Sequence, residues 1–134
     1  MLQAASLGLL ALLLGFSFSM ALTRFDTRKQ LVLDEANAIG TTYLRAQLLP
    51  DPARKEVSNL LRRYVDVRLE FYQAGINQSR LQRVDDDTEK LHRALWSYAV
   101  ATGGQDPRAI PTGLFIQSLN EVIDLHAKRA TAME

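Results

Sequence analysis

The hydrophobic pattern of the chain changes at residue 23. Residues 1–22 are almost wholly apolar and carry no charged side chain, whereas beyond them apolar residues recur three and four positions apart. About 20 apolar residues at ~1.5 Å each match the ~30 Å hydrocarbon core of a bilayer. Recurrence at three and four predicts amphipathic helices that bury one face. The pattern therefore predicts a transmembrane helix over 1–22 and a helical domain over 23–134.

Residues that break helices divide the second part into four expected segments. Their ranges are 23–49, which continues the apolar run, 51–75, about 79–102 and about 112–130. Pro50 ends the first segment because proline disfavours helical geometry in the residue before it. Asp51 suits the N-cap of the second helix and Pro52 its first position, while Gly75 and the Gly103-Gly104 pair are expected to end the second and third. Short connections between helices of similar length predict an all-α fold, an antiparallel bundle rooted in the membrane.

The first amphipathic segment has a predicted inner face and one weak point. Apolar residues at helical spacing place the buried face on Val32, Ala36, Ile39, Tyr43 and Ala46. Gly40 interrupts this helix at a cost of ~1 kcal/mol relative to Ala. Either a neighbouring backbone comes close at Gly40 or the helix is loose there.

The apolar run has a competing interpretation as a cleaved signal peptide, because Ser19-Met20-Ala21 resembles a cleavage site. A signal peptide usually has a basic residue ahead of a core of ~7–15 residues, and this run has no such residue and is longer. A retained transmembrane helix is therefore favoured. Arg24, Arg28 and Lys29 directly follow the run, so the positive-inside rule places the remainder of the chain in the cytoplasm.

Small residues form a seam along the apolar run. They lie three or four positions apart, at Ala4, Gly8, Ala11, Gly15 and Ser19. Such a seam lets a second helix approach closely in lipid, where no hydrophobic drive favours association. The alternative is that these residues are simply common in membrane helices.

Charge and composition exclude several classes of function. The chain has 16 basic and 15 acidic residues, all at or beyond Arg24, so no strong positive field is present for nucleic acid. It has no Cys, which excludes disulfides, thiolate catalysis and thiolate metal sites. Phosphate-binding and hydrolase motifs do not occur. We therefore expect neither an enzyme nor a cofactor.

One polar cluster remains as a candidate site. Carboxylates, an amide and a His on the first and last helices could face each other across the bundle: Asp34, Glu35, Asn37, Glu121, Asp124 and His126. The helical Glu/His pairs typical of bundle metal centres are missing, so no metal is expected and His126 is interpreted as a packing residue. His92 is expected on the exposed side near Trp96. The acidic run 85–89 is interpreted as a solvated helix face rather than a cation patch.

Four stretches carry a family resemblance over nearly the whole chain. They are Gly15–Ala21 (GFSFSMA), Leu33–Thr41 (LDEANAIGT), Tyr64–Tyr72 (YVDVRLEFY) and Leu119–His126 (LNEVIDLH). The chain resembles the bacterial bestrophin-like membrane proteins, a family of unassigned function. The resemblance implies a protein of the cell inner membrane. Because members carry further apolar segments before and after the part that matches, it also implies that this chain is a partial member.

The resemblance extends more distantly to the true bestrophins, which are pentameric anion channels. It implies a homo-oligomer in the lipid bilayer with a small anion as ligand, and it makes Phe16 and Phe18 candidates for an apolar constriction that gates by dewetting. The bestrophin pattern at the end of a pore helix matches Ala21, Arg24 and Phe25 and then fails at Asp26. The alternative function is a membrane-tethered helical scaffold that binds a protein partner.

Overall fold

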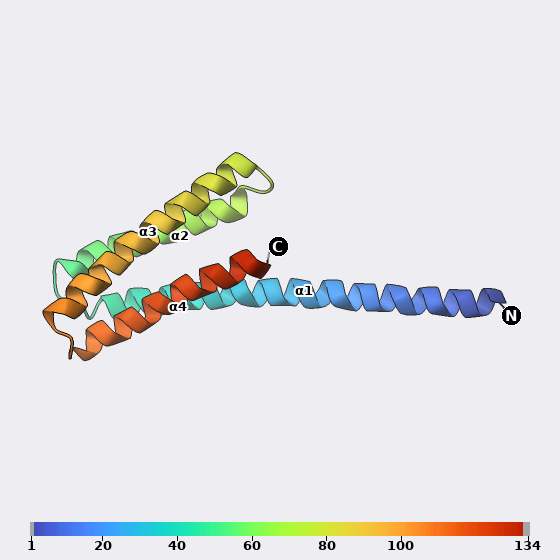
Figure 1. Ribbon diagram of the computed structural model, residues 1–134, viewed down its shortest axis with the longest axis horizontal. Helices are drawn as coiled ribbons and strands as arrows, with labels where there is room; N and C mark the ends of the chain where they lie inside the picture. Colours follow the sequence, from blue (N-terminus) through green and yellow to red (C-terminus); the bar gives the residue numbers. More distant parts are fainter. Residues whose placement is uncertain (1, 133–134) are drawn as a thin grey trace.

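A computed structural model describes residues 2–132 as four helices (Figure 1). They are α1 (Leu2–Ala46), α2 (Ala53–Gln73), α3 (Gln78–Gln105) and α4 (Ile110–Ala132). The predicted all-α fold, with a long apolar helix followed by a helical bundle, is confirmed. Met1 and residues 133–134, which belong to the two predicted segments, lie outside the described part.

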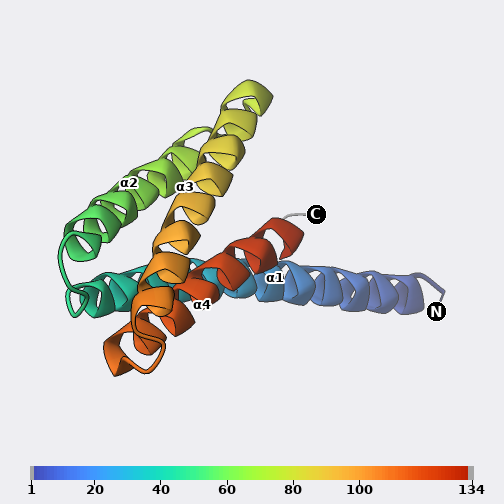
Figure 2. The ribbon, with the colours of Figure 1, turned by 60° about the vertical axis from the view of Figure 1, so that its left-hand side comes forward.

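The four helices form a ring in which each helix runs antiparallel to its neighbours. The C-terminal half of α1 packs against α2 and α4, and α3 packs against the same two helices from the other side. Both views show the α2–α3 hairpin leaning away from α1 toward its tip, while the N-terminal half of α1 projects beyond the bundle (Figures 1 and 2). At ~1.5 Å per residue, the 45 residues of α1 are about 67 Å long.

Two helix boundaries differ from the prediction. Asp51 does not cap α2, because Pro52 holds the N-cap position without a side-chain cap bond and the Asp51 carboxylate instead pairs with Arg54 at 2.7 Å. Gly103-Gly104 does not end α3, which continues to Gln105. Gly103 packs near Ile116 of α4, since a Cβ there would lie 3.5 Å from Ile116 Cδ1. We infer that packing against α4 outweighs the ~1 kcal/mol cost of each helical glycine.

Other boundaries follow the local chemistry of the sequence. Gly75 ends α2 with φ +59°, a left-handed conformation that glycine adopts without strain. Asn77 then caps α3, because its side-chain oxygen accepts a hydrogen bond of 3.1 Å from the Arg80 backbone N–H. The tight turn between α2 and α3 therefore has both a stop signal and a start signal.

The core of the bundle lies in two layers. The first, near the loops that join α1 to α2 and α3 to α4, consists of Ala46, Leu49, Val57, Leu61, Leu95, Ala99, Phe115 and Leu119. The second, closer to the projecting half of α1, consists of Ala38, Tyr64, Val67, Val84, Leu91, Val122 and Leu125. Every helix contributes to both layers, so all four helices share the apolar core.

The predicted inner face of α1 was wrong by part of a turn. Its buried residues are Glu35, Ala38, Thr42 and Ala46, whereas Val32 and Ala36 are exposed. The polar groups are buried with partners: the Thr42 hydroxyl donates to the Ala38 carbonyl at 2.7 Å, and Glu35 binds two arginines. Apolar periodicity could not identify this face because two of its four residues are polar.

The first half of α1 has no packing partner within the described chain. Among the described residues, α1 is the one helix long and apolar enough to cross a membrane, and none of its most apolar stretch is buried. Exposed fractions of 66% at Leu7 and 71% at Phe18 are typical of this surface. A continuous apolar surface of this size indicates contact with lipid or with other protein.

The core can be tested with a matched pair of leucines. Leu95 is fully buried and Leu44 is 69% exposed. Leu95→Ala is expected to lower the free energy of unfolding in detergent by about 2–5 kcal/mol, because it leaves a cavity, whereas Leu44→Ala should change it by less than about 0.5 kcal/mol. Denaturant titration followed by circular dichroism measures both. Equal losses would contradict the assigned core.

Candidate functional site

A carboxylate from α1 is buried between two arginines, at the end of the bundle closer to the projecting half of α1. The Nε of Arg68, on α2, donates to Glu35 Oε1 at 2.7 Å, and Nη1 of Arg129, on α4, donates to Glu35 Oε2. All three side chains are at least nine-tenths buried. This cluster, Glu35–Arg68–Arg129, joins three helices and is termed the ion cluster.

Two aromatic rings cover the guanidinium groups of the ion cluster. Arg68 Cζ lies 4.7 Å from the centroid of the Phe71 ring, and Arg129 Cζ lies 4.8 Å from that of Tyr72. Both distances fall in the range of cation–π contacts, which are strongest when the cation is shielded from water. Burial raises the pKa of Tyr72, so the Tyr72 hydroxyl stays neutral beside the cations.

The charges of the ion cluster do not balance. One carboxylate faces two guanidinium groups, and arginine stays protonated in proteins. Removing charges from water is costly unless each has partners, and here Glu35 uses both oxygens while each arginine gains an aromatic face. The cluster therefore keeps one excess positive charge inside the bundle.

Two histidines and a tyrosine lie beside the ion cluster. His92 Nε2 is 3.0 Å from the Tyr64 hydroxyl, and the His92 and His126 rings meet edge to face with centroids 5.3 Å apart. His126 Nδ1 is buried without a hydrogen-bond partner among the described residues, and its Nε2 is 3.8 Å from Asp85. The prediction that His92 is exposed near Trp96 was wrong, since its ring is partly buried against Tyr64 and His126.

These histidines are neutral near pH 7. Burial and the neighbouring His126 lower the pKa of His92 to about 4. Burial and the positive charge of Arg68 lower the pKa of His126. Burial and the carboxylate of Glu35 raise the pKa of Tyr64. The two histidines and Tyr64 thus add no charge beside the ion cluster.

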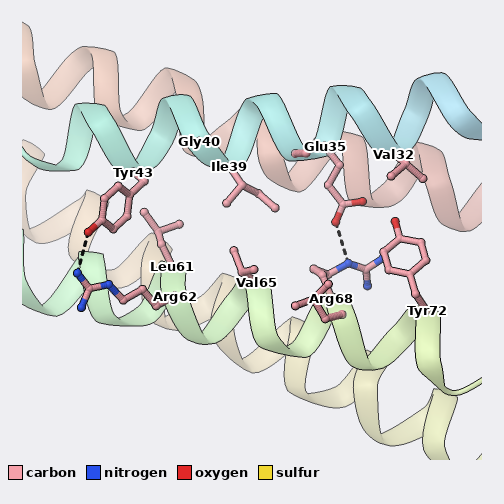
Figure 3. A pocket seen from close by; sticks show the side chains of 12 residues that line it. Val32, Glu35, Ile39, Gly40, Tyr43, Leu61, Arg62, Val65, Arg68 and Tyr72 are labelled. Atoms are coloured by element: carbon pink, nitrogen blue, oxygen red, sulfur yellow. Dashed lines mark hydrogen bonds and ion pairs between the residues drawn. The ribbon is translucent and has the colours of Figure 1, made fainter.

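An apolar groove of about 470 Å³ lies between α1 and α2 (Figure 3). Val32, Ile39 and Tyr43 line it from α1, and Val65 and Leu69 face them from α2. Glu35 and Arg68 lie toward one end, just before Val32 and Tyr72, while Arg62 donates to the Tyr43 hydroxyl at 2.9 Å at the other. Gly40 also borders the groove, and a Cβ there would meet nothing within 4 Å. Packing within the described chain therefore does not require a glycine at position 40.

The six residues of the predicted polar cluster separate into different environments. Asp34, Asn37 and Glu121 line a shallow polar depression of about 390 Å³ between α1 and α4. Glu35 points instead to the arginines, and His126 points to His92. Asp124 is exposed and belongs to neither group. In the described part of the chain, no set of three acidic or histidine side chains is arranged to hold a metal ion.

The predicted sites in the apolar run all lie on the exposed half of α1. The seam residues Ala4, Gly8, Ala11, Gly15 and Ser19 share one face, and a Cβ at Gly8 or Gly15 would meet nothing within 4 Å. Phe16 and Phe18 are 61% and 71% exposed. Two positions apart on a helix they point about 200° apart, so at most one of them can face a common axis.

Sequence reasoning missed the ion cluster although it identified Glu35. The signal was present: Arg68 follows Tyr64 and Val67 on the buried stripe of α2, with Phe71 one turn further. Arg129 lies one turn beyond His126 and Leu125 on the inner face of α4. A basic residue on the buried face of a helix needs a buried acidic partner, and Glu35 is that partner.

Comparison with known proteins gives one match. The family model of the Bestrophin-like domain matches residues 2–134. No significant match to the chain was found among curated proteins or among solved structures. The match includes α1 as well as the bundle, so the apolar helix and the ion cluster lie within the same domain.

The ion cluster can be tested through its single carboxylate. Glu35→Gln leaves two buried guanidinium groups without a counter-charge and is expected to lower the free energy of unfolding by about 3–5 kcal/mol. Glu121→Gln, at an exposed carboxylate on α4, is the control and should change it by less than about 0.5 kcal/mol. Denaturant titration in detergent gives both values. Similar small losses would show that Glu35 is not the counter-charge.

The histidines predict a dependence of stability on pH. A folded pKa of about 4 for His92, against 6.5 ordinarily, means that the unfolded chain binds more protons between these values. The free energy of unfolding should therefore fall as the pH is lowered from 6.5 toward 4. The double variant His92→Gln, His126→Gln should show a shallower fall in thermal melts across this range. An unchanged slope would contradict the neutral state assigned to the histidines.

Proposed function

Because the chain belongs to the Bestrophin-like domain family, we propose that it forms part of a channel-like membrane oligomer that conducts a small anion. In this proposal α1 crosses the cell inner membrane and the bundle lies on the cytoplasmic side. The family match and the exposed apolar half of α1 support the membrane part. The basic residues Arg24, Arg28 and Lys29 directly after that half support the orientation.

The observation that carries the oligomer is an unpartnered stripe along α1. Positions seven apart on a helix drift by only ~20° per step, so a stripe of such positions winds slowly around the helix, by about 80° over four steps. Starting at Gly8, this stripe passes through Gly15, Leu22 and Lys29 to Ala36, which lines the groove between α1 and α2. The stripe is exposed over these positions. It joins the small-residue seam in the membrane half to the groove of the bundle half.

A helix from a second copy fits such a stripe. Within the bilayer, small residues let two helix backbones approach closely. Beyond the bilayer, an apolar groove can accept apolar side chains of a partner helix. Gly40 supports the same interpretation, because a glycine costs ~1 kcal/mol in a helix and nothing in the described chain approaches it. Close approach of a backbone from another copy would explain why a glycine stands at position 40.

The pathway for the anion would run along these membrane helices. A hydrophobic constriction gates by excluding water, and an aromatic ring facing the axis supplies one. Since Phe16 and Phe18 point about 200° apart, one of them faces the pathway in this proposal and the other faces lipid or a neighbouring helix. The cytoplasmic bundles would continue the pathway beyond the bilayer.

Chloride efflux from liposomes tests the proposal, with the full-length protein as the sample. Efflux above that of empty vesicles is expected. Gly8→Ile with Gly15→Ile should reduce both efflux and the oligomer mass measured by analytical ultracentrifugation, because larger side chains fill the seam. Ser6→Ile with Ser17→Ile is the matched control, since these small residues lie on the opposite face of α1 and should leave both unchanged.

Two results would contradict the proposal. Absence of chloride efflux from an intact oligomer would contradict the proposed channel function and favour the membrane-tethered scaffold. A monomeric protein, or equal effects of the glycine and serine pairs on oligomer mass, would remove the interface assigned to α1.

A further inference from the structure

A second hollow, of about 480 Å³, lies where α1 leaves its apolar run. It is bordered by α1, by the end of α2 and by the end of α4. Phe25, Phe71 and Tyr72 supply aromatic walls, and Arg28, Lys29 and Arg129 supply the charges. The hollow adjoins the groove between α1 and α2, because Val32 and Tyr72 line both.

The lining of this hollow carries three cations and no carboxylate. Arg28 and Lys29 are exposed, whereas the Arg129 side chain is only 8% exposed and already shares Glu35 with Arg68. Asp85 lies beside Arg129 in a separate small cavity, where it faces His126 and is 58% exposed. The hollow therefore has an excess of positive charge with a buried component, and an anion would complement it.

The position of the hollow selects the kind of anion. Arg28 follows Leu22 by six residues, or about 9 Å along the helix, which places it at the outer edge of the headgroup layer that extends ~5–8 Å beyond the hydrocarbon core. Phe25 is 64% and Tyr72 46% exposed, and aromatic residues are enriched at this depth of a bilayer. Basic pockets beside membrane helices suit phosphate headgroups.

We propose that this hollow binds an anionic phospholipid. Arg28 and Lys29 hold the phosphate, Arg129 adds the field of the buried excess charge, and an acyl chain follows the apolar surface of α1 past Phe25. The site ties the bundle to the membrane surface at the start of its cytoplasmic part. It requires that α1 cross the bilayer and does not depend on ion conduction. Lys29 also lies on the stripe of α1 assigned to a second copy, so the oligomer mass is measured in the same variants.

Native mass spectrometry of the detergent-solubilised protein tests the site. The probes are dioleoyl-phosphatidylglycerol and dioleoyl-phosphatidylcholine at equal concentration, which differ in net charge and share their acyl chains. The phosphatidylglycerol adduct is expected to exceed the phosphatidylcholine adduct about 25-fold, since Arg28 and Lys29, as basic residues near a membrane surface, each contribute on the order of a factor of five. Arg28→Gln with Lys29→Gln should bring the ratio close to one.

Control variants and a competing anion distinguish a phospholipid in the hollow from free phosphate or a second copy of the chain. Lys55→Gln with Lys90→Gln removes the same charge from exposed positions away from the hollow and should leave the lipid ratio of the unmodified protein unchanged. An equal loss in both pairs, or no preference in the unmodified protein, would overturn the proposal. Displacement of the lipid by inorganic phosphate in large excess would assign a free-phosphate site instead. Loss of the oligomer in Arg28→Gln, Lys29→Gln with an unchanged lipid ratio would assign the hollow to a second copy.

Discussion

The structure depends on the burial of Glu35 between Arg68 and Arg129. This ion cluster joins α1, α2 and α4 at one point, and its geometry allows a single rotation of α1 about its axis. Once Glu35 faces inward, Ala38, Thr42 and Ala46 follow it into the core, and Val32 and Ala36 turn outward. We infer that this buried ion pair contributes more to the choice of one arrangement of the helices than to net stability.

That rotation determines which face of the remainder of α1 is directed away from the bundle. Because α1 is one continuous helix, the face chosen at Glu35 is transmitted to the membrane half, where the seam containing Gly8 and Gly15 points away from the bundle of its own chain. The groove between α1 and α2 and the basic hollow near Phe25 are consequences of the same rotation. The interior of the bundle thus decides which surfaces are left for lipid or for other copies.

The sequence predicted the helices, the bundle and the apolar span, because each depends on periodicity and on local breakers. The buried residues of α2 follow such a periodicity, from Val57 through Tyr64 to Val67. The inner face of α1 and the ion cluster could not be predicted in this way, since a buried Glu35 is recognised only when its arginines from two other helices are known. Gly103-Gly104 was misjudged because packing against α4 outweighs local propensity.

The central claim is that the orientation fixed by Glu35 leaves one stripe of α1 for a second copy. Site-directed crosslinking in membranes tests it directly, because the chain has no Cys and single cysteines can be placed at will. With a short bismaleimide, cysteines at Gly15 and Gly40 are expected to give covalent dimers, while cysteines at Ser17 and Glu121 stay monomeric. Dimers from Ser17 and Glu121 with none from Gly15 and Gly40 would contradict the account.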